Sequence, residues 1–315
     1  MTDDPVKSHP VTAVLIAGGA GFVGQRLTQA LLARNVSVIH LRRQESTQRP
    51  LAAGVQSITY ADLAAAQPGA HQVDAIVNLA GRSISEGRWT PVQKREILDS
   101  RVRVTEAIVH AIAHGALRPA VLVNASAVGY YGASQSRTFT EDDGPVADDF
   151  LAGVCSHWEQ AALSSEPLGV RVVRARFGVV LGSGGGALAK LVLPYRLHAG
   201  GPLGDGEQFV SWIHLDDAVA LLLWTLERPD LSGPVNITAP APVTMNQLGQ
   251  EIASLLHARH WLPAPTFALR AALGQKADMV LKGQRVIPQK ALQSGFTFQY
   301  PDIQSALRHL LVQAR

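Results

Sequence analysis

The sequence is poor in cysteine, in charged residues and in long apolar runs. Its 315 residues include one cysteine, Cys155, so an internal disulfide is excluded. Charged residues make up only 17% against 47% hydrophobic residues, a balance that argues against intrinsic disorder. The longest purely apolar stretches, such as residues 218–224, fall far short of the ~20 residues that cross a bilayer. We therefore expect a globular protein without a membrane partner.

The first residues and the overall charge restrict location and partners. The start, MTDDPVKSHP, lacks the apolar run of a secretory signal, so we expect a cytoplasmic protein with a loose tail over residues 1–10. The 28 Lys and Arg residues against 25 Asp and Glu give a net charge of +3, spread along the chain without a basic block. This small excess does not indicate a nucleic-acid partner; local arginine pairs suit an anionic small molecule.

Short apolar runs alternate with helical patterns along the chain. Such alternation predicts an α/β fold, a Rossmann-type doubly wound parallel sheet with helices on both faces. We expect the nucleotide-binding core to span residues 11–181, and a smaller C-terminal lobe on the substrate side, interleaved with the core, to span residues 182–315. One helix is expected over residues 92–114, and strands over 11–17, 36–41, 75–80, 121–124, 171–181 and, late in the chain, 235–237.

A glycine pattern directly follows the first expected strand and opens a helix. Gly18, Gly21 and Gly24 are spaced as G-x-x-G-x-x-G within a β-α-β unit of about thirty residues. Glycine permits a tight turn and lets the backbone approach a pyrophosphate, which the helix N-terminus then attracts. A side chain at Gly21 is expected to block the pyrophosphate and to strain the turn. The alternative is a glycine turn that only packs.

The end of the second strand carries Arg42 and Arg43. An acidic residue there would bind the ribose 2′-hydroxyl of NAD and repel a 2′-phosphate. Guanidinium groups instead bind phosphate through paired hydrogen bonds, so the pair predicts NADP(H). The alternative for either arginine is a solvated strand end.

Motifs further along resemble the extended short-chain dehydrogenase/reductase superfamily. Residues 78–81, Asn-Leu-Ala-Gly, are similar to its N-x-A-G motif, and residues 126–132, 211–217, 236–240 and 283–296 look like one atypical branch. That branch is the NAD-dependent epimerase/dehydratase-like family, often labelled sugar-nucleotide epimerase, with its own C-terminal extension. The resemblance implies an NADP(H) site formed by Gly18, Gly21, Phe22, Val23, Arg42, Arg43, Leu79, Ala80, Gly81, Arg101, Ser126 and Val180.

The resemblance does not extend to the catalytic Ser-Tyr-Lys set of typical members. The Tyr131-Gly132 pair places Ala127 at the serine position, and Glu159 sets a register that places Leu151 at the tyrosine position and Cys155 at the lysine position. A leucine cannot transfer a proton, and a neutral thiol cannot supply the positive charge of lysine. The catalytic residues are therefore unknown, with Tyr131 and Cys155 as candidates. For each, the alternative is a packed side chain.

An arginine, an acidic cluster and a second glycine run also bear on the expected site. Arg101 is expected to reach the cofactor or an anionic substrate; the alternative is an exposed helix charge paired with Asp99 or Glu96. No metal site is predicted, because the cluster at residues 214–217 resembles a strand end where an aspartate caps the next helix. The glycine run at residues 182–186 is interpreted as a flexible entrance to the substrate cleft.

Two functions follow from these patterns and remain open. One is an NADP(H)-binding oxidoreductase or epimerase-like protein that acts on an unknown small polar or sugar-like substrate without the standard catalytic set. The other is a regulatory protein that binds NADPH without turnover. By analogy with extended relatives, a homodimer through the helices near residues 92–114 and 152–163 is also expected.

Overall fold

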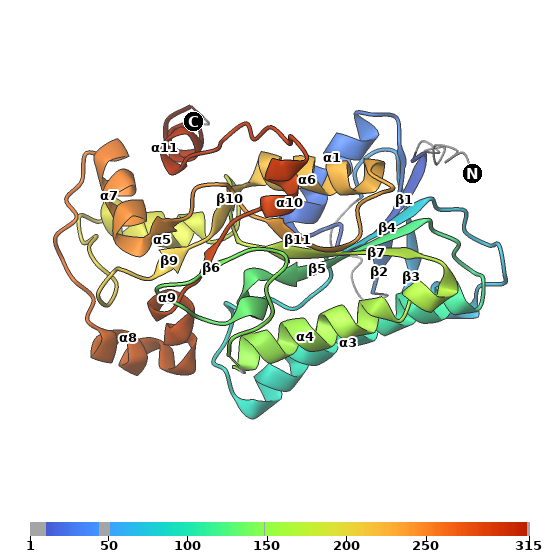
Figure 1. The fold of residues 1–315 in the computed structure, drawn as a ribbon, viewed down its shortest axis with the longest axis horizontal. Coiled ribbons are helices and arrows are strands. Elements are labelled where there is room, and N and C mark those ends of the chain that lie inside the picture. The colour runs from blue at the N-terminus through green and yellow to red at the C-terminus, as the bar shows by residue number, and fades with distance from the viewer. Residues whose placement is uncertain (1–10, 44–50, 148, 314–315) are drawn as a thin grey trace.

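A seven-stranded parallel sheet forms the centre of the computed structural model (Figure 1). The structure describes residues 11–43, 51–147 and 149–313, so the expected tail over residues 1–10 lies outside the described residues. The strand order β11-β7-β5-β4-β1-β2-β3 reverses between β1 and β4, and this confirms a doubly wound, Rossmann-type α/β fold. The strands are β1 (Ala13–Ala17), β2 (Ser37–Arg42), β3 (Val55–Thr59), β4 (Ala75–Asn78), β5 (Val121–Ala127), β7 (Arg171–Phe177) and β11 (Gly233–Ile237).

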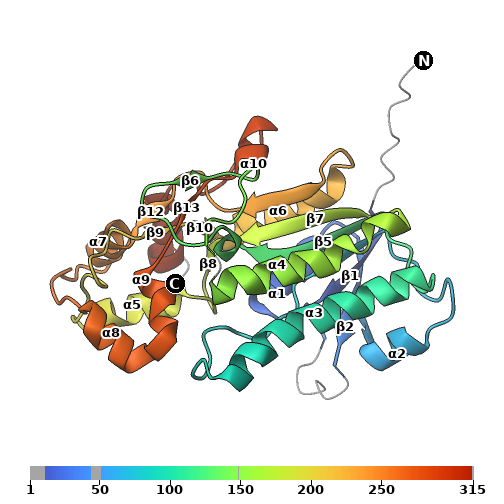
Figure 2. The same ribbon diagram turned by 60° about the horizontal axis from the view of Figure 1, so that its bottom comes forward.

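Helices cover both faces of this sheet, because both faces of its strands are apolar. Val14 and Ile16 point to one face and Leu15 and Ala17 to the other, as the two-residue period of a strand requires. The first face packs against α1 (Phe22–Leu32) and α6 (Leu215–Glu227). The second packs against α2 (Tyr60–Ala65), α3 (Pro91–Ala113) and α4 (Phe150–Leu163), and α3 and α4 lie side by side in Figure 2. No helix in the described ranges is long and apolar enough to cross a membrane.

The strand expected over residues 171–181 is two strands in two different sheets. The break falls at Gly178, where an added Cβ would collide with the Ser211 carbonyl oxygen. After this close contact the chain leaves the central sheet, and β8 (Val179–Leu181) pairs with β10 (Trp212–His214). The prediction of one long strand is therefore wrong, since the apolar run continues across a change of partner.

The C-terminal lobe lies beyond the carboxyl ends of the central strands and has its own apolar cluster, which includes Trp212, Leu248, Ile252 and Leu307 (Figure 1). Its small strands are β9 (Phe209–Val210) with β12 (Val243–Thr244), and β6 (Thr138–Phe139) with β13 (Arg285–Val286). The β6–β13 pair joins an early loop to a late one. The remaining helices are α5 (Leu188–Arg196), α7 (Met245–Leu255), α8 (Thr266–Leu273), α9 (Asp278–Leu281), α10 (Gln289–Gln293) and α11 (Ile303–Arg308).

Candidate functional site

The glycine turn joins β1 to α1 at the point where the strand order reverses. Gly18 has φ +83°, and a Cβ on it would lie 2.8 Å from the backbone carbon and oxygen of Leu79. Gly21 is the N-cap of α1, with φ −77°, and no side chain caps that helix. The first-turn amides of α1 therefore have no side-chain acceptor and could hold an anion. The expected strain at Gly21 is wrong, because the left-handed backbone belongs to Gly18.

The two arginines lie at the carboxyl end of the strand beside β1. Arg42 is the last residue of β2 and is half-buried, and Arg43 follows it and is exposed. Because β2 pairs in parallel with β1, both arginines lie at the same edge of the sheet as the glycine turn. This edge could hold the phosphate of an adenosine ribose next to a pyrophosphate on α1.

The turn after β4 is fixed by a buried polar network. The Asn78 side chain donates to Thr105 Oγ1 at 2.9 Å and to Asn124 Oδ1 at 2.7 Å, and its oxygen accepts from the Ala80 amide at 3.2 Å. The Trp158 indole donates to the same Thr105 hydroxyl at 3.1 Å. These bonds place the backbone of residues 79–81 beside Gly18. The sequence predicted that this turn and the glycine turn lie together, and the structure brings them together.

Arg101 on α3 lies over the same turn and is not an exposed helix charge. Its Nη1 donates to the carbonyls of Arg82 and Ile97, and its guanidinium lies 5.1 Å from the centre of the Trp158 ring. Burial lowers the pKa of Arg101 below its ordinary value. Its expected alternative partner, Glu96, instead pairs with Arg82 at 2.6 Å. Arg101 therefore offers a desolvated cation beside the Gly81 backbone.

The three positions of the missing catalytic set lie together but carry no suitable group. Ala127 ends β5, Leu151 packs near Gly129, and Cys155 is 5% exposed one helical turn later. Burial raises the pKa of the Cys155 thiol to about 11, so the thiol is neutral at physiological pH. These positions can pack against a cofactor but cannot transfer a proton to a substrate.

Tyr131, the other catalytic candidate, is fully buried. Its hydroxyl donates to Asn236 Oδ1 at 2.7 Å, and burial raises the pKa of Tyr131 to about 12. A hydroxyl with a protein acceptor and no solvent exposure has no path to a substrate in this conformation. The structure therefore places Tyr131 and Cys155 as packed side chains, which is the alternative to a catalytic role.

A buried ion cluster beneath this region was missed by sequence reasoning. Glu159 accepts from Arg176 through both carboxylate oxygens, at 2.8 and 2.9 Å, and from Ser126 Oγ at 2.8 Å. Arg174 adds a contact of 3.2 Å, and the Arg176 guanidinium lies 3.6 Å from the centre of the Tyr130 ring. Ser126, expected near the cofactor, is thus held by Glu159. The local signal was the set of three arginines, Arg171, Arg174 and Arg176, in a strand whose other residues are apolar.

The glycine run at residues 182–186 packs on α1. Added Cβ atoms at Gly182 and Gly185 would each lie 2.7 Å from the Phe22 ring, and one at Gly186 would lie 2.9 Å away. Phe22 is the first residue of α1. The run therefore packs against the Phe22 ring and leads into α5. We call residues 182–186 the strap; it is a packed segment and not the flexible entrance that the sequence predicts.

The cluster at residues 214–217 is structural, although not in the expected way. The N-cap of α6 is His214, whose Nδ1 accepts from the Asp216 amide at 3.0 Å. Asp217 instead accepts from the amides of Gln299 and Tyr300, and Asp216 pairs with Arg26 of α1 at 2.7 Å. The prediction of an aspartate cap is wrong. Within the described ranges, no group of three or more His, Cys, Asp or Glu side chains could hold a metal ion.

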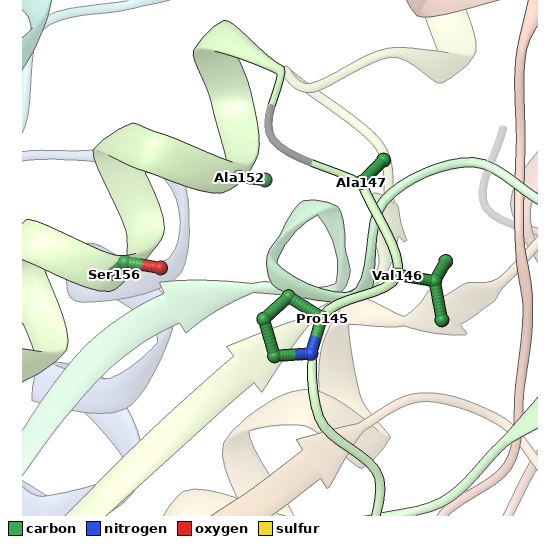
Figure 3. Close-up of a pocket in the computed structure, with 5 residues that line it drawn as sticks. All are labelled: Pro145, Val146, Ala147, Ala152 and Ser156. Atoms are coloured by element: carbon green, nitrogen blue, oxygen red, sulfur yellow. The ribbon is translucent and has the colours of Figure 1, made fainter.

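A shallow pocket of about 310 Å³ lies between the first turns of α4 and the preceding loop (Figure 3). Its α4 residues, Ala152 and Ser156, each follow Leu151 or Cys155 by one position, so they lie on an adjacent side of the helix. Ser156 provides the one polar side chain of the lining. Such a lining cannot hold a pyrophosphate, so we do not assign the cofactor to it. The lining residues are Pro145, Val146, Ala147, Ala152 and Ser156.

Comparison with known protein families covers most of the chain. Residues 14–238 match the NAD-dependent epimerase/dehydratase family, and residues 264–310 match a domain of unknown function, DUF1731. The epimerase family protein YfhF of Bacillus subtilis is 42% identical over 303 residues, which is 96% of this chain and 99% of that protein. A chloroplastic SDR39U1 homologue of Arabidopsis thaliana is 43% identical over 302 residues, 95% of this chain and 86% of that protein.

Two solved structures with more than 25% identity are similar. The human epimerase family protein SDR39U1 (isoform 2), crystallised with NADPH, has a TM-score of 0.85 and 35% identity, covering 95% of this chain and 98% of that one. A nucleoside-diphosphate sugar epimerase from Corynebacterium glutamicum has a TM-score of 0.75 and 30% identity, covering 96% of this chain and 59% of that one.

Proposed function

The chain belongs to the NAD-dependent epimerase/dehydratase family, and we propose that it is an NADP(H)-binding oxidoreductase or epimerase-like enzyme. The observation that carries this proposal is the convergence of the Gly18–Gly21 turn and the Arg42–Arg43 pair on one edge of the sheet. The presence of NADPH in the human SDR39U1 structure supports the same cofactor. The other residues expected to contact it are Phe22, Val23, Leu79, Ala80, Gly81, Arg101, Ser126 and Val180.

The substrate would lie between the core and the C-terminal lobe, where the nicotinamide end of a cofactor bound across the reversal point must emerge. The cofactor supplies hydride transfer when it is bound. The residues of this chain would then bind and orient the substrate and exclude water. Neither Cys155 nor Tyr131 receives a proton-transfer role in this conformation, because both are buried. The small polar or sugar-like nature of the substrate stays a prediction from the resemblance, as do a homodimer through α3 and α4 and a cytoplasmic location.

A regulatory protein that binds NADPH without turnover is the second candidate function. It is favoured by Ala127, Leu151 and Cys155 at the positions of the usual catalytic set, with a thiol whose pKa burial raises to about 11. A protein with such positions would bind NADPH without turning over a substrate.

A substrate screen separates the two functions. Purified protein would be incubated with NADPH and with carbonyl compounds or nucleotide sugars, and turnover would be followed by NADPH absorbance. We expect turnover of at least one compound, abolished by Gly21→Val. Robust NADPH binding without turnover across the screen would instead support the regulatory function.

A further inference from the structure

The lobe helix α5 carries an exposed stripe on the side opposite its buried residues. Its buried residues are Leu188, Val192 and Tyr195. Lys190, Leu193 and Leu197 are three and four residues apart, so they share the opposite side of the helix. Leu193 is 54% exposed and Leu197 is 67% exposed. Two exposed leucines one helical turn apart form a small apolar surface on this side of α5.

Lys190 shows which way this stripe faces. Its Nζ donates to Ser85 Oγ at 2.9 Å, in the core loop between β4 and α3. A second lobe lysine reaches the same loop, because Lys276 Nζ donates to the Ser85 carbonyl at 2.5 Å and to the Gly87 carbonyl at 2.8 Å. The side of α5 that carries Lys190 therefore lies toward the core loop that holds residues 85–87.

The two lysines bring positive charge without acidic partners. Among the described residues, no carboxylate oxygen lies within 4.0 Å of either ammonium group, including that of Glu86 in the same loop. Residues 188–204 contain two basic residues and no Asp or Glu, whereas Arg270 near Lys276 is already paired with Asp278 at 3.3 Å. Two ammonium groups that converge on one serine and contact only neutral oxygens leave a field that an anion would neutralise.

Exposed apolar side chains accompany both lysines. Leu193 and Leu197 follow Lys190 on α5, and Leu273, 38% exposed, ends α8 shortly before Lys276. No residue of α8 is buried, and its Phe267 is 76% exposed. The lobe wall thus combines two cations with an apolar surface, whereas a site built for a sugar would need many hydrogen-bonding side chains.

On the premise that the chain is an NADP(H)-binding enzyme, and in place of the sugar-like substrate that the resemblance predicts, we propose that the substrate is an amphipathic acid, with a carboxylate or phosphate held by Lys190 and Lys276 and an apolar chain along Leu193 and Leu197. The strap that touches Phe22 leads directly into α5, so Lys190 lies in the turn nearest the cofactor helix. The acid group therefore lies toward the cofactor. The apolar chain runs outward for the about 10 Å that separate residues 190 and 197 along a helix.

Titration calorimetry on NADP⁺-saturated protein tests this with three probes: octanoate, an apolar anion; 1-octanol, its neutral counterpart; and UDP, a polar anion. We expect octanoate to bind at least tenfold more tightly than either of the others. Lys190→Gln with Lys276→Gln keeps hydrogen-bond donors and removes the charge, so it should weaken octanoate at least fivefold and leave octanol unchanged. Leu193→Ser with Leu197→Ser should weaken both octanoate and octanol.

Matched controls separate this site from general effects. Arg34→Ala removes an exposed cation at the far end of α1, and Leu292→Ser removes an apolar side chain on α10 that is 44% exposed. Neither should alter octanoate binding. Tighter binding of UDP than of octanoate, or octanoate binding that both double variants leave unchanged, would overturn the inference. NADPH is titrated first on each sample: its failure to bind the wild type overturns the proposed function too, whereas NADPH binding without octanoate binding overturns this inference alone.

Discussion

At the residue scale, the parts of the site that come from one stretch of sequence could be predicted, and those that join distant stretches could not. Gly18 and Gly21 are recognisable because the turn needs a left-handed residue at the first and an uncapped helix start at the second. The Arg176–Glu159 pair depends on how β7 packs against α4. A buried arginine has no local signature of its partner, so this pair emerged only from the structure.

The arginine pair gives the first prediction at this scale. Replacing both residues, Arg42→Ala with Arg43→Ala, should remove the preference for NADPH over NADH while NADH binding stays within a few fold. The wild-type preference is expected to be at least tenfold, which corresponds to about 1.4 kcal/mol and is within reach of one charge-assisted phosphate contact. Nicotinamide fluorescence titrations measure both affinities. A double variant that still prefers NADPH tenfold would show that other groups bind the 2′-phosphate.

Two glycines of the same turn should fail in different ways. At Gly21 an added Cβ meets only the Gly18 carbonyl, at 3.1 Å, so Gly21→Val should fold but lose detectable NADPH binding. At Gly24 an added Cβ would collide with the Gly18 carbonyl and the Gly19 backbone, so Gly24→Val should lower the stability of the apoprotein itself. Urea unfolding and calorimetric titration of both variants check this. Equal losses of stability would mean that Gly21 also serves packing.

At the element scale, the predicted helices and central strands were placed well, and the failures occur where packing overrides local pattern. The helix expected over residues 92–114 is α3, Pro91–Ala113, and the late strand is β11. Strand β3 was missed because it is an edge strand, mostly polar and only partly buried, without the apolar run that marked the others. The apolar run over residues 171–181 hid a change of sheet at Gly178.

The contact between β7 and α4 gives a prediction for the buried ion cluster. Glu159→Ala would leave the fully buried Arg176 without its carboxylate, which should cost about 3–5 kcal/mol in the free energy of unfolding. A matched control is Glu227→Ala, which breaks the exposed pair with Arg34 and should cost less than about 1 kcal/mol. Urea unfolding midpoints give both values. Similar small losses for the two variants would show that Arg176 finds other partners or water.

The N-cap of α6 gives a prediction for pH. Burial lowers the pKa of His214 from 6.5 to about 4, so the unfolded chain takes up this proton at a higher pH than the folded one. The contribution of His214 to the free energy of unfolding is therefore complete above about pH 6.5. As the pH falls toward 4, the free energy of unfolding decreases by roughly 3 kcal/mol. His214→Asn keeps a capping acceptor without titrating.

The difference in unfolding free energy between wild type and His214→Asn should accordingly shrink as the pH falls from 6.5 to 4. His257→Asn is the control, because it changes an exposed histidine in the left-handed region, which asparagine tolerates. The loss of stability between pH 6.5 and 4 that His214 causes should persist in this control. A parallel curve for His214→Asn would instead mean that His214 titrates alike in both states.

At the scale of the whole molecule, the alternation of strands and helices in the sequence predicts the central sheet. The contacts between the C-terminal region and this sheet could not be predicted in the same way. The lobe is fixed by contacts such as Lys276 with Ser85, 191 residues apart, and by the pairing of β6 with β13. No sequence period encodes such pairs, so the contacts that fix the C-terminal region against the core could not be predicted from the sequence. The architecture places the glycine turn, the arginine pair and the residue 79–81 turn together at the carboxyl edge of the central sheet.

The central claim is that this edge is an NADP(H) site, and the most direct test is a calorimetric titration of the wild-type protein with NADPH and, separately, with NADH. The account predicts one NADPH per chain, bound at least tenfold more tightly than NADH. Absence of NADPH binding, or equal affinities for the two nucleotides, would contradict it.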